Sequence, residues 1–173
     1  QATSSLFDPL IEQRTLDIVR GVERDGDKAL LNYTRLFDGP SLRAADLAIS
    51  TKRLAEAWNA IRPKTKRAIR LAKANVASFA RQSLRKNWKA RNTQGGSVGE
   101  KFDPFQRVGV YIPGGTAPLA STTLMTVTLA KAAGCLEIVA CTPCDKNGEV
   151  NPDLLAALGQ AGATEVYRVC LLY

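Results

Sequence analysis

The sequence contains no histidine among its 173 residues. Histidine is the commonest general base and the commonest metal ligand, because its pKa lies near neutrality and its neutral imidazole coordinates metals. The hydroxyls of Ser121, Thr122 and Thr123 therefore have no conventional base that could activate them as nucleophiles. From its residues alone, the chain offers no catalytic residue and no metal ligand.

Long apolar runs are also missing, and none approaches the roughly 20 residues that a membrane-spanning helix needs. The first ten residues, QATSSLFDPL, lack the basic region and the apolar stretch of a secretory signal. We therefore expect no membrane association and a cytoplasmic location.

Cysteine is sparse, with Cys135, Cys141, Cys144 and Cys170 as its only occurrences. In a chain this long they do not form the disulfide framework of a small secreted domain, so we interpret them as reduced thiols. The pair in Cys141-Thr-Pro-Cys144 is followed by a turn sequence, whereas a thioredoxin-like pair begins a helix. No second pair has zinc-knuckle spacing, so packing is the favoured role.

Acidic residues are almost absent from residues 51–91, which contain thirteen Lys or Arg and one acid, Glu56, in a chain of net charge +8. A basic segment of this kind could bind nucleic acid, a nucleotide cofactor or an acidic partner surface. The more usual interpretation is a solvated helix face. Too few aromatic residues accompany the charges to stack single-stranded bases, which disfavours nucleic acid.

The first part of the chain has the patterns of helices. Asp8-Pro9 and the apolar residues that follow predict an amphipathic helix ending near Gly21, and a second helix is expected over residues 25–37. Residues 47–50 predict a short extended piece, with Ser50 or Thr51 capping the next helix.

A long helix is expected over residues 62–86. Its apolar stripe is predicted to consist of Ile69, Ala72, Val76 and Phe79. Three basic residues lie on a different face of the same helix, namely Lys66, Arg70 and Lys73.

Residues 92–96, NTQGG, predict a turn between two short strands, and beyond it strands and helices alternate. Strands are expected at residues 108–112, 137–141 and 165–169, with helices at residues 119–133 and 152–158. The predicted fold class is α/β, with a helical region at residues 1–91 and an incomplete Rossmann-like parallel βαβαβ layer at residues 92–173.

The turn between the first parallel strand and its helix is the most informative segment. Residues 113–115, Pro-Gly-Gly, break the strand, and glycine permits positive φ and close backbone approach by a ligand. Thr116 can cap the helix, Pro118 suits its first turn, and the free N–H groups there favour an anion. The segment matches neither a P-loop nor a Gly-x-Gly-x-x-Gly fingerprint, so a nucleotide loop and a purely structural turn both stay open. Tyr111, at the strand end, could contact a ligand or simply pack.

Residues 107–119, RVGVYIPGGTAPL, closely resemble histidinol dehydrogenase. Residues 19–38, VRGVERDGDKALLNYTRLFD, resemble the N-terminal helical region of that family. Residues 138–143, IVACTP, and 161–166, AGATEV, continue the resemblance, which extends from about residue 10 to residue 169.

The resemblance implies oxidation of L-histidinol through the aldehyde to L-histidine in histidine biosynthesis, with NAD and zinc as cofactors. Members of the family are usually cytoplasmic homodimers in which each active site borrows residues from the partner. The tyrosine of the family's YIPGG motif contacts NAD, and this role carries over to Tyr111. The family's acid–base pair, its zinc ligands and its substrate contacts lie in a part that this sequence does not contain.

Family members continue past the position of Val169 into a Gly-rich turn and another helix, and residues 170–173 do not match that pattern. We therefore expect a fragment of the N-terminal part that is inactive alone. Two other hypotheses stay open. One is a non-catalytic nucleotide-binding remnant that uses the Tyr111 loop. The other is an interaction module in which a sheet edge and the basic helix contact a protein or nucleic acid.

Overall fold

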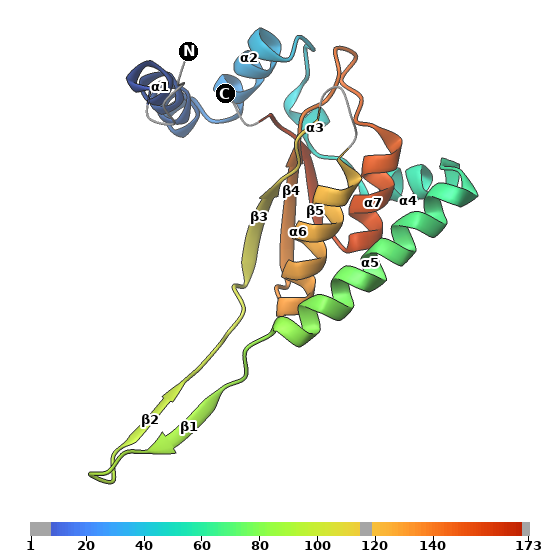
Figure 1. Ribbon diagram of the computed structural model, residues 1–173. Coiled ribbons are helices and arrows are strands. Elements are labelled where there is room, and N and C mark those ends of the chain that lie inside the picture. The colour runs from blue at the N-terminus through green and yellow to red at the C-terminus, as the bar shows by residue number, and fades with distance from the viewer. Residues whose placement is uncertain (1–7, 115–118, 171–173) are drawn as a thin grey trace, which may run out of the picture.

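The computed structural model describes residues 8–114 and 119–170, and the account below is confined to them. The helices are α1 (Pro9–Asp25), α2 (Asp27–Phe37), α3 (Ala44–Leu47), α4 (Thr51–Ala60), α5 (Pro63–Ser83), α6 (Ala120–Ala133) and α7 (Pro152–Ala161). The strands are β1 (Trp88–Arg91), β2 (Ser97–Glu100), β3 (Arg107–Tyr111), β4 (Glu137–Thr142) and β5 (Glu165–Arg168). Helices dominate the first part of the chain, and strands alternate with helices after it (Figure 1).

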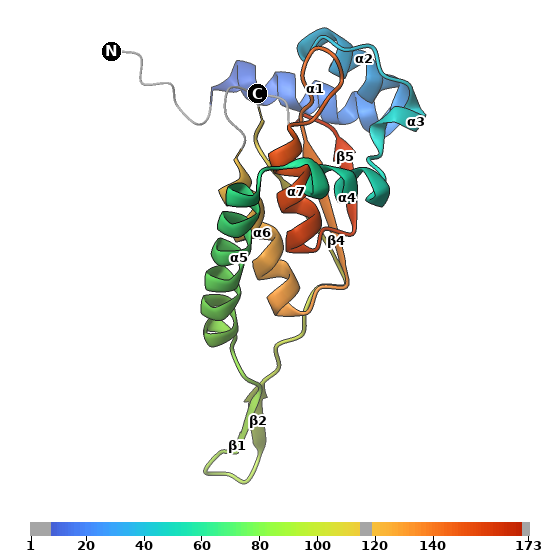
Figure 2. The ribbon, with the colours of Figure 1, turned by 90° about the vertical axis from the view of Figure 1, so that its right-hand side faces the viewer.

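The strands β3, β4 and β5 form a parallel sheet in that order. The helices α6 and α7 cover one face of this sheet, and α4 and α5 pack outside them as a further layer (Figures 1 and 2). The predicted α/β class with an incomplete parallel sheet is confirmed. The extended piece predicted at residues 47–50 begins one residue later, because Leu47 ends α3. Ala48 bridges Tyr167 antiparallel, and the Ser50 hydroxyl accepts a hydrogen bond from the Arg53 N–H at 3.2 Å, as predicted for the cap.

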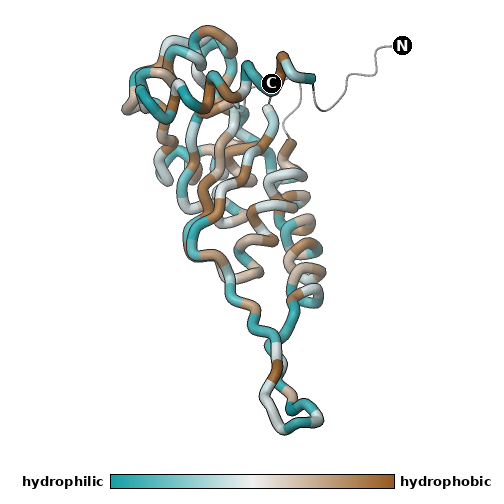
Figure 3. Tube along the Cα trace, turned by 90° about the vertical axis from the view of Figure 1, so that its left-hand side faces the viewer, coloured by the Kyte–Doolittle hydropathy of each residue, from teal (hydrophilic) through white to brown (hydrophobic). Residues whose placement is uncertain are grey.

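The strands β1 and β2 pair as an antiparallel hairpin that projects away from the sheet (Figure 3). Its turn lies at residues 92–96, as the Asn-Thr-Gln-Gly-Gly sequence predicts, and the Asn92 side chain accepts a hydrogen bond from the Gly96 N–H at 2.7 Å. All eight strand residues are exposed, so the hairpin adds nothing to the hydrophobic core.

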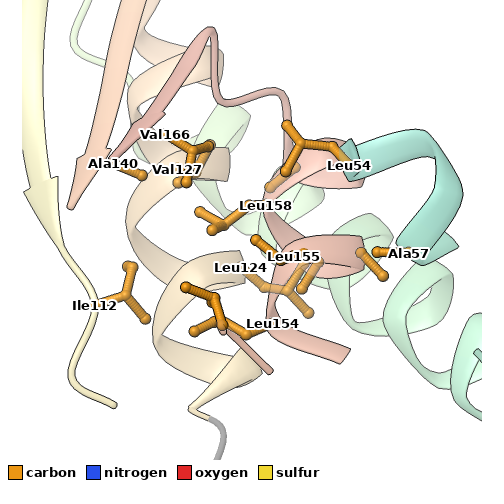
Figure 4. Close-up of a cluster of buried hydrophobic side chains, with 14 of the residues drawn as sticks. Leu54, Ala57, Ile112, Leu124, Val127, Ala140, Leu154, Leu155, Leu158 and Val166 are labelled. Atoms are coloured by element: carbon orange, nitrogen blue, oxygen red, sulfur yellow. The ribbon is translucent and has the colours of Figure 1, made fainter. Parts of the chain in front are cut away.

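The core lies between the sheet and the helices, and α7 is its centre (Figure 4). Five consecutive α7 residues, from Leu154 to Leu158, are at most 2% exposed. They pack among Leu54 and Ala57 of α4 and Val166 of β5. This core draws on residues from both sides of the predicted boundary at 91/92, and the division into two domains stays a prediction.

The helix α1 does not end near Gly21 but continues to Asp25, so the predicted end is wrong. Gly21 is buried, and a Cβ at this position would lie 2.6 Å from the Tyr33 hydroxyl oxygen of α2. The glycine therefore allows two helices to approach each other. Gly26, with a φ of 57°, is the residue that separates α1 from α2.

The inner face of α5 differs from the predicted stripe at one position. Phe79 is 71% exposed, and the neighbouring Ala80 is buried in its place, beside the confirmed Ile69. A small side chain on this turn lets α5 lie close to α6, whereas a phenylalanine ring would hold the two helices apart.

Three of the six basic residues of α5 contact neighbouring helices. Lys66 donates to the Asn59 carbonyl oxygen at 3.0 Å, and Lys73 donates to the Gln160 carbonyl oxygen at 2.5 Å. These carbonyls lie in the last turns of α4 and α7, where a cation also interacts favourably with the negative end of the helix dipole. Lys66 and Arg70 lie over the Trp58 ring at 5.8 Å and 5.1 Å. Lys66 and Lys73 are therefore bound to neighbouring helices, whereas Arg70 stays exposed to solvent.

Replacing Leu158 by alanine tests the central position of α7. Because its side chain is fully buried, the substitution leaves a cavity and should lower the free energy of unfolding by about 2–5 kcal/mol. Urea denaturation followed by circular dichroism measures this loss. The matched control is Leu36→Ala, because Leu36 is 67% exposed; a similar loss in both variants would contradict the assigned core.

Because the pKa of Asp46 is lowered in the folded chain, the stability of the fold should depend on pH in the acid range. Hydrogen bonds from the Arg43 side chain and backbone lower the pKa of Asp46 from 3.8 to about 2. A depressed folded-state pKa stabilises the fold above pH 3.8, and this contribution is lost as the pH falls toward about 2. In acid titrations of stability, Asp46→Asn should be less stable than the parent at pH 7, with the two curves converging below that window. Curves that stay parallel to pH 2 would refute this role.

Candidate nucleotide-binding site

Tyr111 is the last residue of β3 and lies at the carboxyl end of the parallel sheet. The next residue, Ile112, is fully buried, and its N–H donates to the Cys141 carbonyl oxygen at 2.9 Å. Because side chains alternate along a strand, Tyr111 lies on the face opposite to the helices. Ligands of open α/β sheets bind outside the carboxyl ends of the strands, which is where this side chain lies.

The surroundings of Tyr111 on this face are half-open. Its register partner Cys141 pairs in turn with Tyr167, so two aromatic side chains lie on either side of a small one. Earlier on the same face of β3 is Gly109, where an added Cβ would meet no atom within 4 Å. The Tyr111 hydroxyl oxygen lies 3.8 Å from the Cys170 sulfur. The site thus offers an aromatic surface beside open space.

The end of α2 also reaches this edge of the sheet. Burial raises the pKa of Asp38, and a hydrogen bond with Cys170 opposes that rise. Asp38 also helps to raise the pKa of Cys144, for which burial is the larger cause. A carboxylate from the helical region therefore lies near the ends of the strands, which the sequence did not reveal because the two segments are more than 100 residues apart.

Gly114 is required by packing within the chain. A Cβ at Gly114 would lie 2.6 Å from Cγ of Pro143, which follows β4. The turns after β3 and β4 are therefore in close contact at this edge, and Gly114 is not among the glycines with positive φ. The sequence predicted close approach by a ligand, which stays a prediction, whereas the close neighbour that the structure shows is Pro143. Gly115, Thr116 and Pro118 lie outside the described residues.

The N-cap residue of α6 does not cap the helix, and Thr123 of α6 and Thr142 at the end of β4 have buried hydroxyls. Leu119 occupies the N-cap, and its apolar side chain cannot accept hydrogen bonds from the first-turn N–H groups. Within the described chain, the hydroxyls of Thr123 and Thr142 are buried without a hydrogen-bond partner. Uncapped amides at a helix start bind anions, and unpaired buried hydroxyls cost about 1–3 kcal/mol each unless a ligand or water meets them. These features fit a phosphate-bearing cofactor.

The cysteines do not form a redox or metal centre. All four are reduced thiols, as predicted. Burial raises the pKa of Cys141, Cys144 and Cys170, which keeps these thiols protonated, whereas a reactive redox pair needs a lowered pKa. Over residues 8–114 and 119–170, no three potential ligands gather to hold a metal ion. The described residues therefore do not fit a zinc site.

An ion-pair network lies at the amino end of the same open face. The Arg107 guanidinium contacts the carboxylates of Glu137 and Glu165 at 2.5 Å and 2.7 Å, and the Tyr167 hydroxyl donates to Glu165 at 2.7 Å. Hydrogen bonds from Arg107 lower the pKa of Glu165. The network links all three strands. Arg107 and Glu137 are register partners, so a correct alignment of the two strands would have predicted their ion pair.

The fold defines an α/β domain with a three-stranded parallel sheet, and Tyr111 lies at the carboxyl end of that sheet. Comparison with known proteins names the family. The model of the histidinol dehydrogenase family matches residues 3–170. The chain belongs to the histidinol dehydrogenase family.

Individual relatives agree with this assignment. Histidinol dehydrogenase from Symbiobacterium thermophilum is 40% identical over 163 residues, covering 94% of this chain and 37% of the relative. The enzyme from Bacteroides thetaiotaomicron is 41% identical over 166 residues, covering 96% of this chain and 37% of the relative. The crystal structure of histidinol dehydrogenase from Elizabethkingia anophelis superposes with a TM-score of 0.86 at 31% identity, covering 92% of this chain and 36% of that one.

The chain thus spans between a third and two fifths of the length of these relatives. None of the helices in the described ranges is both long enough and apolar enough to cross a membrane.

Replacing each of two glycines at this site by alanine should change the free energy of unfolding in different directions. Gly114→Ala forces the turn away from Pro143 and should lower the free energy of unfolding by about 1–3 kcal/mol. Gly109→Ala meets open space and should leave stability unchanged or raise it by up to about 1 kcal/mol. Denaturant midpoints of the two variants provide the comparison, and equal effects would contradict the close contact between the two turns.

Proposed function

We propose that this chain supplies the NAD-contacting part of a histidinol dehydrogenase. The reaction is the NAD- and zinc-dependent oxidation of L-histidinol to L-histidine that the family resemblance implies. The observation that carries the proposal is the family match over residues 3–170 together with Tyr111 at the carboxyl end of the sheet. Bound NAD supplies a hydride acceptor, and the residues of this chain bind and orient it.

In this proposal, Tyr111 and the start of α6 contact different parts of the dinucleotide. The Tyr111 ring, beside the open surface at Gly109, contacts a planar part of NAD. The first-turn amides of α6 bind its phosphates, because the side chain of the N-cap residue Leu119 is apolar and does not cap them. Aromatic contact and anion binding at one strand end are what a nucleotide requires.

The catalytic steps need groups that these 173 residues do not bring together. The sequence has no histidine, and the described residues hold no cluster of metal ligands. We therefore propose that the chain does not oxidise histidinol by itself, and that acid–base groups and zinc ligands belong to the parts of the relatives that it does not span. Assembly as a cytoplasmic homodimer is part of the same proposal. Zinc-dependent turnover of histidinol by the purified 173-residue chain would overturn it.

Calorimetric titration with NAD tests the binding role directly. Tyr111→Ala should weaken NAD binding about tenfold or more, corresponding to about 1.4 kcal/mol, because the aromatic contact is lost. The matched control is Tyr167→Phe, which keeps the neighbouring ring on the same face and removes only its hydrogen bond to Glu165.

Equal losses in the two variants would show that the effect is not specific to Tyr111. A folded parent chain that gives no heat with NAD would contradict the binding role of the loop. Circular dichroism of each sample separates loss of binding from loss of fold.

A further inference from the structure

The outer face of α5 exposes two large apolar side chains, which no other described residue buries. Leu71 is 65% exposed and Phe79 is 71% exposed, although both lie on a 21-residue helix whose other face is packed in the core. Ala68, Leu71, Asn75, Phe79 and Gln82 recur at intervals of three or four residues, so they lie along one side of the helix. We name these five residues the α5 stripe.

The α5 stripe borders two shallow hollows in the surface. One is lined by Lys64, Arg67, Ala68 and Leu71, and the other by Asn75, Ser78, Phe79, Gln82 and Ser83. Apolar anchors at helical spacing, with hollows beside them, are the arrangement that receives the side chains of a second helix.

The charges of α5 restrict what can bind there. The helix has six Lys or Arg residues and no acid. Lys66, Arg70 and Lys73 are engaged with α4 and α7 on the inner side. The other three, Lys64, Arg67 and Arg81, have no acidic partner within the described residues, and Lys64 and Arg67 line the first hollow.

We propose that the α5 stripe is a docking surface for an acidic amphipathic helix of a partner protein. The apolar residues of that helix would cover Leu71 and Phe79, and its carboxylates would pair with Lys64, Arg67 and Arg81. A second copy of α5 is a poor occupant, because two helices without a single acid would repel each other. A nucleic acid is disfavoured, because Lys66 and Lys73 are hydrogen-bonded to carbonyl oxygens of neighbouring helices, and the Leu71 and Phe79 side chains are exposed between the remaining charges. The proposal is independent of the nucleotide site.

The test uses two synthetic 21-residue amphipathic peptides labelled with fluorescein, in a length that follows α5. Both carry leucine at heptad positions a and d; one has glutamate and the other lysine at the flanking positions. Fluorescence anisotropy with the full chain should show binding of the glutamate peptide, at least tenfold weaker binding of the lysine peptide, and weakening of the former as salt rises.

Two double variants, one neutral and one charge-reversing, separate apolar docking from simple charge attraction. Leu71→Ser with Phe79→Ser should weaken binding of the glutamate peptide at least tenfold, and Arg67→Glu with Arg81→Glu should do the same. Leu36→Ser is the matched control, because Leu36 is equally exposed but lies on α2, and it should leave the affinity unchanged. Because all of these side chains are exposed, unfolding midpoints should stay at the parent value.

Three outcomes would overturn the proposal. The first is equal affinity for both peptides, or no loss in the serine double variant. The second is binding of a 20-base-pair DNA duplex, unchanged by the serine substitutions, in a chain that ignores the glutamate peptide. The third is self-association of the parent chain in sedimentation velocity that the serine substitutions abolish, which would assign the stripe to a second copy.

Discussion

The burial of α7 is the constraint on which the rest of the structure depends. A helix whose middle residues, Leu154 to Leu158, are apolar on every side has to be enclosed on every side. The sheet and α6 enclose it from one direction, and α4 and α5 from the other. Because of this requirement, α4 and α5 pack against α6 and α7, and their buried residues belong to the same hydrophobic core as the sheet.

The same arrangement determines where the site lies. Covering one face of the sheet with helices leaves the other face with Tyr111, Cys141 and Tyr167 half-open at the carboxyl end. The ion pairs of Arg107 hold the strands together at the amino end of that open face. Among the described residues, the helices α6 and α7 pack on the face of the sheet opposite to Tyr111, so the proposed contact of Tyr111 with NAD would lie on the other face.

Much of the local structure followed from the sequence. The hairpin turn at residues 92–96 and the alternating strands and helices after it were predicted to within a few residues, because turn composition and apolar period are local signals. The errors came from residues whose role depends on a distant partner. Gly21 was interpreted as a helix end but makes room for Tyr33, and Phe79 was assigned to the core but lies outside it.

The candidate site shows the same division. The family, the class of fold and the place of Tyr111 at a strand end could be identified from contiguous motifs. The contact of Gly114 with Pro143, the binding of Lys66 and Lys73 to helix ends, and the position of Asp38 near the strand ends became visible in the folded chain. Such contacts join residues that are far apart in the chain, and their geometry exists only once the layers around α7 have packed.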